Sequence, residues 1–259
     1  HYLYNMQLNY KVFGSGEPLI ILHGLLGSLD NWQTLAKKYA EQYTVFIIDQ
    51  RNHGKSPHSD EFSYDIMVED LLEFCESNFI FTCNLLGHSM GGKVAMQFAL
   101  TYPDYVDKLI IADIAPVRYQ AGHNEIFKAL RKVDLSQIKE RKEVDEILAT
   151  SIPEFGIRQF LMKGLTRGDE NEFIWKFNLK SLWDNYANIL DAFETTEKFD
   201  KSSLFISGGK SSYVNSSNSI MVDQFFPNNT KEVIDGAGHW LHAEKPEEFF
   251  EKTQAFLEA

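Results

Sequence analysis

The sequence predicts an α/β fold in which a mostly parallel central sheet is covered by helices on both faces and a helical cap is inserted into the chain. Three observations lead to this prediction. Short apolar runs alternate with amphipathic helical patterns. These runs are apolar throughout, which is typical of parallel strands buried on both faces. The repetition stops at residue 118 and resumes after residue 198.

Each element is predicted from its own pattern. Residues 6–12 alternate between polar and apolar side chains, as a half-buried strand does. The other strands are apolar or β-branched runs at 18–22, 44–48, 109–112 and 204–207, with further strands beginning at Cys83 and covering 231–234. Helical patterns lie between the strands at 31–42, 64–78 and 91–102. The order of these segments predicts repeated strand–helix–strand units.

The segment 118–198 has no clear strand and is rich in aromatic residues. We expect it to form a helical cap subdomain on a core made of residues 1–117 and 199–259. A cap at the carboxyl ends of parallel strands covers the crevice where such folds bind ligands. Most of its aromatic side chains should pack the cap onto the core. The candidates to line a pocket for an acyl or aryl group are Phe127, Phe155, Phe160, Trp183, Tyr186 and, outside the cap, Trp240.

The composition limits the partners of the chain. Its 259 residues carry a formal net charge of −12, which disfavours nucleic acids and anionic membranes because both require a basic surface. No apolar run approaches the ~20 residues that cross a bilayer, and two cysteines, Cys75 and Cys83, are too few for a secreted disulfide scaffold. We expect a cytoplasmic monomer or homodimer that acts on a small molecule. The chain does not begin with Met, so a removed targeting segment remains open.

The most informative motif is Gly87-His88-Ser89-Met90-Gly91, which follows an apolar run and precedes a helical pattern. A serine on a sharp strand-to-helix turn has a strained backbone, and glycine neighbours leave room for that turn. The following helix directs its unpaired N–H groups towards the place where an oxyanion would form. The motif therefore predicts that Ser89 is a catalytic nucleophile.

A serine hydroxyl needs a general base, and the base needs a carboxylate to orient it. The predicted base is His239, which lies in a glycine-rich loop after the strand 231–234. His242 is its competitor, with capping or packing as the expected alternative role. The other candidates, His88, His53 and His23, are interpreted as structural. The histidine spacing does not indicate a metal site.

The carboxylate is predicted at Asp113, directly after the strand 109–112. A buried carboxylate requires a partner, which His239 would provide. In this architecture the acid often follows the later strand 204–207, but a serine, Ser211, stands at that place. We expect the Ser211 hydroxyl to donate a hydrogen bond to Asp113 and hold it in position.

The oxyanion hole requires two backbone N–H groups. Met90 follows the nucleophile and provides the first, and Leu25, in the glycine-containing loop after the strand 18–22, is predicted to provide the second. A second loop, 49–56, ends in Gly54-Lys55-Ser56 like a phosphate-binding loop. Position 49 is aspartate, however, where that motif requires glycine. We interpret this loop as a structural turn beside the active site.

Together these motifs resemble the α/β-hydrolase fold superfamily over nearly the whole chain. They are most similar to the small bacterial acyl-ester hydrolases and their mitochondrial relatives. The matching segments are His23-Gly24, Asp49-Gln50-Arg51-Asn52-His53-Gly54-Lys55-Ser56, Gly87-His88-Ser89-Met90-Gly91-Gly92-Lys93, Asp113-Ile114-Ala115-Pro116 and Gly238-His239-Trp240-Leu241-His242-Ala243-Glu244-Lys245-Pro246. In that branch the acid follows the strand after the nucleophile helix. The resemblance implies a Ser89–His239–Asp113 triad with esterase activity, and extends to acyl-thioester hydrolysis.

The expected function is two-step acyl transfer on carboxylic esters of small to medium acyl groups, without a metal or organic cofactor. Fold does not fix the reaction, so three alternatives stay open. They are a carbon–carbon bond hydrolase or lyase with the same triad, a cofactor-free haloperoxidase-like activity, and a ligand-binding receptor. Basic groups in the cap would favour the first, and the candidates are Arg118, Arg131, Arg158 and Arg167. Epoxide and haloalkane hydrolysis are disfavoured because they require an aspartate at position 89.

Overall fold

A computed structural model describes residues 6–259. These residues form a seven-stranded sheet in the order β1-β3-β2-β4-β5-β8-β9, in which only the edge strand β1 is antiparallel. The strands are β1 (Tyr10–Phe13), β2 (Glu17–Leu22), β3 (Tyr43–Ile48), β4 (Cys83–His88), β5 (Val106–Ala112), β8 (Ser203–Gly208) and β9 (Asn229–Ile234). The prediction of a mostly parallel sheet is confirmed.

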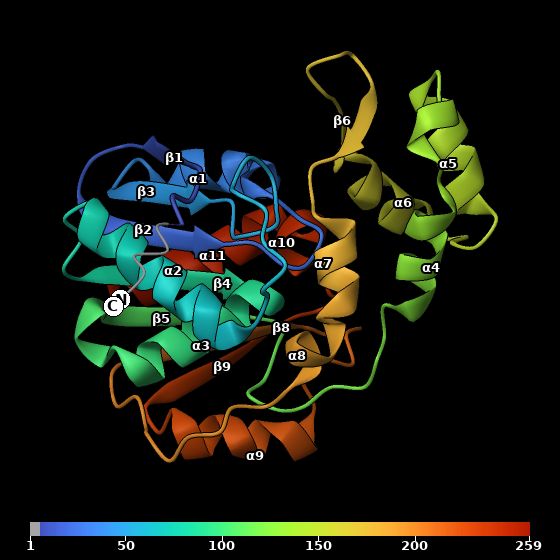
Figure 1. The fold of residues 1–259 in the computed structure, drawn as a ribbon. Coiled ribbons are helices and arrows are strands. Elements are labelled where there is room, and N and C mark those ends of the chain that lie inside the picture. Colours follow the sequence, from blue (N-terminus) through green and yellow to red (C-terminus); the bar gives the residue numbers. More distant parts are fainter. Residues whose placement is uncertain (1–5) are drawn as a thin grey trace.

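Helices cover both faces of this sheet (Figure 1). One face carries α1 (Gln33–Tyr39) and α11 (Pro246–Glu258), and the other carries α2 (Tyr64–Ser77), α3 (Met90–Thr101) and α9 (Ser216–Phe225). Successive strand side chains point to opposite faces. Leu85 of β4 accordingly packs in the cluster that contains the α2 and α3 side chains, and Leu86 packs with those of α1 and α11.

Some boundaries differ from the prediction. The first strand covers only Tyr10–Phe13 and not 6–12, because the backbone N–H and side chain of Asn9 are bonded to Ser56 and Asp49 in the loop after β3. The predicted helix 31–42 is divided into a 3₁₀ turn, Leu29–Trp32, and α1. Helices α9 and α11 lie outside the helical patterns recognised in the sequence.

Residues 118–198, which we call the cap, lie at one end of the sheet (Figure 1). The cap helices are α4 (Asn124–Lys132), α5 (Arg141–Ala149), α6 (Phe155–Met162), α7 (Leu179–Asp184) and α8 (Tyr186–Leu190). The expectation that the cap lacks strands is wrong, because β6 (Leu165–Arg167) and β7 (Phe173–Trp175) form an antiparallel hairpin. Three-residue strands are too short to leave a recognisable period in the sequence. The subdomain boundaries at 117/118 and 198/199 stay a prediction.

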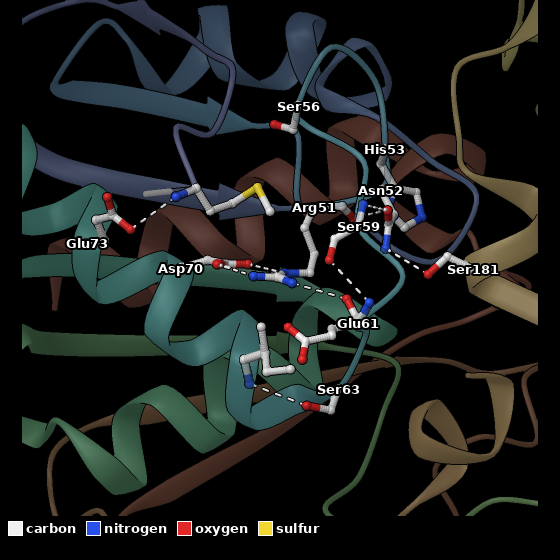
Figure 2. Close-up of polar contacts among 12 residues, drawn as sticks. Arg51, Asn52, His53, Ser56, Ser59, Glu61, Ser63, Asp70, Glu73 and Ser181 are labelled. Atoms are coloured by element: carbon white, nitrogen blue, oxygen red, sulfur yellow. Dashed lines mark hydrogen bonds and ion pairs between the residues drawn. The ribbon is translucent and has the colours of Figure 1, made fainter. Parts of the chain in front are cut away.

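The loop after β3 connects the core to the cap (Figure 2). Arg51 forms a buried two-bond ion pair with Asp70 of α2, and its guanidinium also donates to the Glu61 carbonyl at 3.0 Å. The Asn52 side chain donates to the hydroxyl of Ser181, on α7, at 3.2 Å. The position of the cap is therefore tied to the loop that follows β3. None of the helices formed by residues 6–259 is long and apolar enough to span a membrane.

Candidate active site

Ser89 lies on the tight turn between β4 and α3 with φ 53° and ψ −120°, a left-handed conformation that costs a non-glycine residue energy. Two glycines make the turn sterically feasible. A Cβ on Gly87 would lie 2.2 Å from the carbonyl oxygen of Gly91, and one on Gly91 would lie 2.5 Å from that of His23. The geometry is that of a nucleophile elbow.

Three side chains from separate strand ends meet at this turn. The Nε2 atom of His239 lies 2.9 Å from Ser89 Oγ, and its Nδ1 atom lies 2.6 Å from Asp113 Oδ2. Asp113 directly follows β5, and His239 belongs to the loop between β9 and the short helix α10 (Leu241–Glu244). The arrangement is the nucleophile–base–orienting acid series that acyl-transfer enzymes use.

The Asp113 carboxylate is fully buried, and three donors reach it. Besides His239, the Gly208 N–H donates to Oδ1 at 3.1 Å and the Ser211 hydroxyl donates to Oδ2. The hydrogen bond expected from Ser211 is therefore present. Gly208 was not anticipated, because its amide reaches Asp113 only through the pairing of β5 with β8.

A ring stack and a hydrogen bond fix the histidine loop. The imidazole of His239 is stacked on the ring of Tyr213, with centroids 3.9 Å apart and 17° between the planes. His88 does not face the nucleophile, and its Nε2–H donates to the backbone carbonyl of His239 at 2.8 Å. The contact of Tyr213 with His239 could not be predicted from the sequence, because Tyr213 lies in a loop with no motif around it.

The competitor His242 is removed from the nucleophile. Its ring is stacked on Trp32 at 4.2 Å with an interplanar angle of 6°, and it is almost completely buried. Burial lowers the pKa of His242 to about 3. A neutral, stacked imidazole in this position packs helix α10 against the core.

The predicted oxyanion donors lie on both sides of Ser89. Gly24 brings the loop so close that a Cβ on it would lie 3.3 Å from the Ser89 Cβ, and the next residue is Leu25. No hydrogen bond within residues 6–259 occupies the amide N–H of Leu25 or of Met90. Both amides are therefore free to bind a substrate oxygen.

The loop 49–56 supports the oxyanion loop. The imidazole of His53 accepts a hydrogen bond from the Leu26 amide at 3.1 Å, and His23 accepts one from the Gln50 amide at 3.0 Å. Asp49 accepts a hydrogen bond from the Lys55 amide at 2.9 Å. The segment Gly54-Lys55-Ser56, which resembles the end of a phosphate-binding loop, thus surrounds the carboxylate of Asp49. Burial lowers the pKa of His23 and of His53, so both remain neutral acceptors.

Two cavities open on Ser89 and share the side chains of Leu25, Ser89 and His123. Cavity A borders His239 and is lined by further histidines and by the apolar side chains of Ile126, Ile157, Phe160, Leu161 and Trp240. Cavity B is lined by Lys93, Ile114, Tyr64, Tyr119, Tyr186 and Tyr213. The nucleophile therefore lies between a cavity lined by histidines and apolar side chains and a cavity lined by several tyrosines.

Half of the predicted pocket aromatics lie at these cavities. Phe160 and Trp240 line cavity A, and Tyr186 lines cavity B. The prediction is wrong for the other three, Phe127, Phe155 and Trp183. Phe127 and Trp183 pack against each other inside the cap, with centroids 5.3 Å apart, and Phe155 is 65% exposed beside Arg158.

None of the four cap arginines named as candidates lines either cavity. Arg118 pairs with Asp191 at 3.5 Å, Arg158 binds Asp145, and the other two lie over aromatic rings of the cap. These arginines would favour carbon–carbon bond cleavage if they lined the pocket. They instead make their contacts within the cap.

Comparison with known proteins agrees with this geometry. A family model of the α/β hydrolase fold matches residues 17–146. A marine microorganism esterase of known structure superposes with a TM-score of 0.95 and 42% identity, covering 97% of this chain and 99% of its own. The esterase YbfF of Escherichia coli is 37% identical, with 94% of each chain covered. An sn-1-specific diacylglycerol lipase of Xenopus laevis is also 37% identical, over 98% of this chain and 85% of its own.

The chain belongs to the α/β hydrolase fold family. Within it, the similarity to named esterases over nearly the full length identifies an ester-cleaving serine hydrolase of the carboxylesterase type. The resemblance to the small bacterial esterase branch, inferred from the motifs, is confirmed.

Proposed function

We propose that Ser89, His239 and Asp113 cleave carboxylic esters of small to medium acyl groups through an acyl-serine intermediate. The observation that carries the proposal is the continuous hydrogen-bond series from Ser89 Oγ through both nitrogens of His239 to Asp113. Nucleophile and base lie within the reach that proton transfer requires.

In the first step His239 Nε2 takes the hydroxyl proton of Ser89 as Oγ attacks the ester carbonyl carbon. The carbonyl electron pair moves onto its oxygen, which receives hydrogen bonds from the N–H groups of Leu25 and Met90. The tetrahedral intermediate then collapses. His239 returns the proton to the departing alcohol oxygen, and the acyl group remains on Ser89.

In the second step a water molecule gives a proton to His239 and attacks the acyl carbon. The carboxylic acid leaves and Ser89 regains its proton. Asp113 holds Nδ1–H so that Nε2 faces the serine in the unprotonated form, and stabilises the imidazolium of each step. Ser211 and Gly208 keep the carboxylate in place.

The two cavities suggest how the ester lies. The leaving alcohol must depart beside His239, which donates its proton, and His239 borders cavity A. We assign the alcohol to cavity A and the acyl group to cavity B. The apolar side chains of cavity A suit a hydrocarbon or aryl alcohol, and the restricted space of cavity B suits a short acyl chain.

The test is hydrolysis of p-nitrophenyl esters from acetate to dodecanoate by the purified protein, with Ser89→Ala as control. We expect turnover that peaks at a short or medium chain and is lost in Ser89→Ala. Turnover that persists in Ser89→Ala would contradict the proposal. Absence of turnover in the unmodified protein, on these esters and on acyl thioesters of the same lengths, would favour the carbon–carbon hydrolase or the receptor.

We further propose that the protein works in the cytoplasm as a monomer or homodimer on a small-molecule ester, without nucleic acid or membrane insertion. Cys75 and Cys83 are both free and buried, which suits a reducing compartment. The net charge of −12 suits a partner that is not anionic. Cell fractionation and light scattering of the purified protein test these two points.

A further inference from the structure

His123 lies where the two cavities meet. It precedes the first turn of α4 in the cap, and besides Leu25 and Ser89 it is the residue that borders both cavities. An ester bound across Ser89 therefore passes beside its imidazole. Neither the resemblance to small bacterial esterases nor the Ser89–His239–Asp113 triad gives His123 a role.

The contacts of His123 fix the position of its ring. The Tyr186 hydroxyl lies 3.0 Å from the backbone N of His123, from which it accepts a hydrogen bond, and 2.8 Å from Nδ1. Tyr186 is itself held by the ring of Phe127, with centroids 5.0 Å apart. The imidazole is thus anchored to α8 on its Nδ1 side.

The same contacts fix its tautomer. The phenol proton of Tyr186 has no other acceptor among the described residues, so it is donated to Nδ1. Burial, with a smaller contribution from His239, lowers the pKa of His123 to about 4, and the ring is neutral at pH 7. A neutral imidazole that accepts at Nδ1 carries its proton on Nε2. That Nε2–H has no hydrogen-bond partner within residues 6–259.

We infer that His123 is a specificity-determining residue whose Nε2–H donates a hydrogen bond to a substrate oxygen close to the reacting ester. The substrate class is esters with a neutral ether, hydroxyl or carbonyl oxygen near the ester bond, preferred over hydrocarbon esters of the same shape. This inference rests on the proposed esterase function. The reacting carbonyl oxygen is bound by Leu25 and Met90, so the donor on His123 serves a different oxygen.

The test uses two pairs of esters in which one oxygen replaces one methylene group. Phenyl methoxyacetate is compared with phenyl butanoate for the acyl side, and 2-methoxyethyl butanoate with butyl butanoate for the alcohol side. Each pair gives a preference ratio of kcat/KM values. Comparing this ratio between the unmodified protein and a variant cancels the different intrinsic reactivities of the two esters.

His123→Asn removes the donor at the Nε2 position, and we expect the preference ratio of at least one pair to fall about three- to tenfold, as for loss of one neutral hydrogen bond. His123→Gln places an amide nitrogen near that position and should retain more of the preference. Tyr186→Phe frees the ring and should lower the same ratio. Lys128→Ala, on the exposed face of α4, is the matched control and should leave both ratios unchanged.

The inference would be overturned if folded His123→Asn keeps the preference ratios of both pairs within twofold of those of the unmodified protein. If that variant does not fold, as judged by its thermal unfolding midpoint, Tyr186→Phe decides by the same criterion. Failure of the proposed function has a different signature. It appears as turnover that survives Ser89→Ala, whatever the preference ratios are.

Discussion

At the scale of single residues, the site depends on two unusual backbone conformations. Ser89 and Asp113 both have positive φ angles, 53° and 54°. Each directly follows a strand of the parallel sheet, β4 and β5. The strained turns direct the hydroxyl and the carboxylate out of the sheet towards His239, and the surrounding sheet holds them there.

Asp113→Asn should lower kcat by about three to four orders of magnitude, because an amide cannot hold the imidazole in the productive tautomer. The fold should remain intact, since Gly208 and Ser211 can still bond to the amide side chain. Ser211→Ala removes one of three donors and should cost far less. Steady-state kinetics on p-nitrophenyl butyrate with circular dichroism measure both effects. Near-normal activity in Asp113→Asn would refute the assignment of the acid.

Lys93 is a buried cation one turn after Ser89. Its Nζ donates to the backbone carbonyls of Leu190 and Asp191 at the end of α8 and lies over the rings of Tyr64 and Tyr119. Burial lowers its pKa from 10.5 to about 7. Below pH 7 both folded and unfolded chains carry the charge, so the desolvation cost is fully present.

Between about pH 7 and 10.5 only the unfolded chain keeps that proton, so stability rises with pH. We expect the free energy of unfolding of the unmodified protein, minus that of Lys93→Met, to increase by up to about 1.4 kcal/mol per pH unit. Urea unfolding of both proteins at pH 7 and 9.5 measures the gain. A constant difference between them would show that Lys93 keeps an ordinary pKa.

The sequence predicts Ser89, His239, Asp113 and Ser211 as site residues because each follows a recognisable strand or lies in a glycine-rich loop. Tyr213 and His123 could not be found in this way. Tyr213 reaches His239 from a loop after β8, and the ring of His123 at the cavities is bonded to Tyr186, which is distant in sequence. Such contacts depend on tertiary packing and leave no local pattern.

At the scale of elements, the nucleophile elbow is a place where backbone segments approach closely. Gly91→Ala would place a Cβ 2.5 Å from the carbonyl oxygens of Leu22 and His23. Backbone must therefore shift beside the oxyanion loop, and we expect a loss of about 1–3 kcal/mol of stability together with at least a tenfold loss of kcat. Thermal unfolding and esterase assays measure the two effects.

Gly156→Ala is the control for this prediction. Gly156 lies in α6, and a Cβ on it would project into open space. The substitution should be neutral or stabilise by up to about 1 kcal/mol, since alanine favours helix. Equal effects of the two substitutions would contradict the role given to the elbow.

The elements of the core were predictable and those of the cap were less so. Buried strands such as β4 and β5 are continuous apolar runs, and their order along the chain indicates a parallel sheet. The cap instead combines short helices with the β6–β7 hairpin, whose three-residue strands carry no period. Its aromatic residues were visible, but the sequence does not distinguish Phe160, which lines cavity A, from Phe127, which packs inside the cap.

At the scale of the whole molecule, the fold buries several neutral imidazoles. Burial lowers the pKa of five histidines, which are His23, His53, His88, His123 and His242. They support the oxyanion loop, the histidine loop and the cap. The active site is therefore built on groups that the folded protein keeps uncharged.

This distribution predicts acid sensitivity. Below about pH 6.5 the unfolded chain binds protons at these histidines and the folded chain does not, so stability falls as pH decreases. Each such group contributes up to about 1.4 kcal/mol per pH unit until its folded pKa is reached. Unfolding midpoints at pH 7.5, 6.0 and 5.0 should decrease steeply. A midpoint independent of pH over this range would show that the histidines can be charged in the folded state.

The central claim is that Ser89 carries the acyl group during turnover. The most direct measurement is peptide mapping by mass spectrometry after rapid acid quenching of the protein with p-nitrophenyl butyrate. The account predicts a butyryl adduct on the peptide that contains Ser89 and no adduct on that peptide in Ser89→Ala. In Asp113→Asn the adduct accumulates further if deacylation slows more than acylation. An adduct on a different residue, or full turnover by Ser89→Ala, would contradict it.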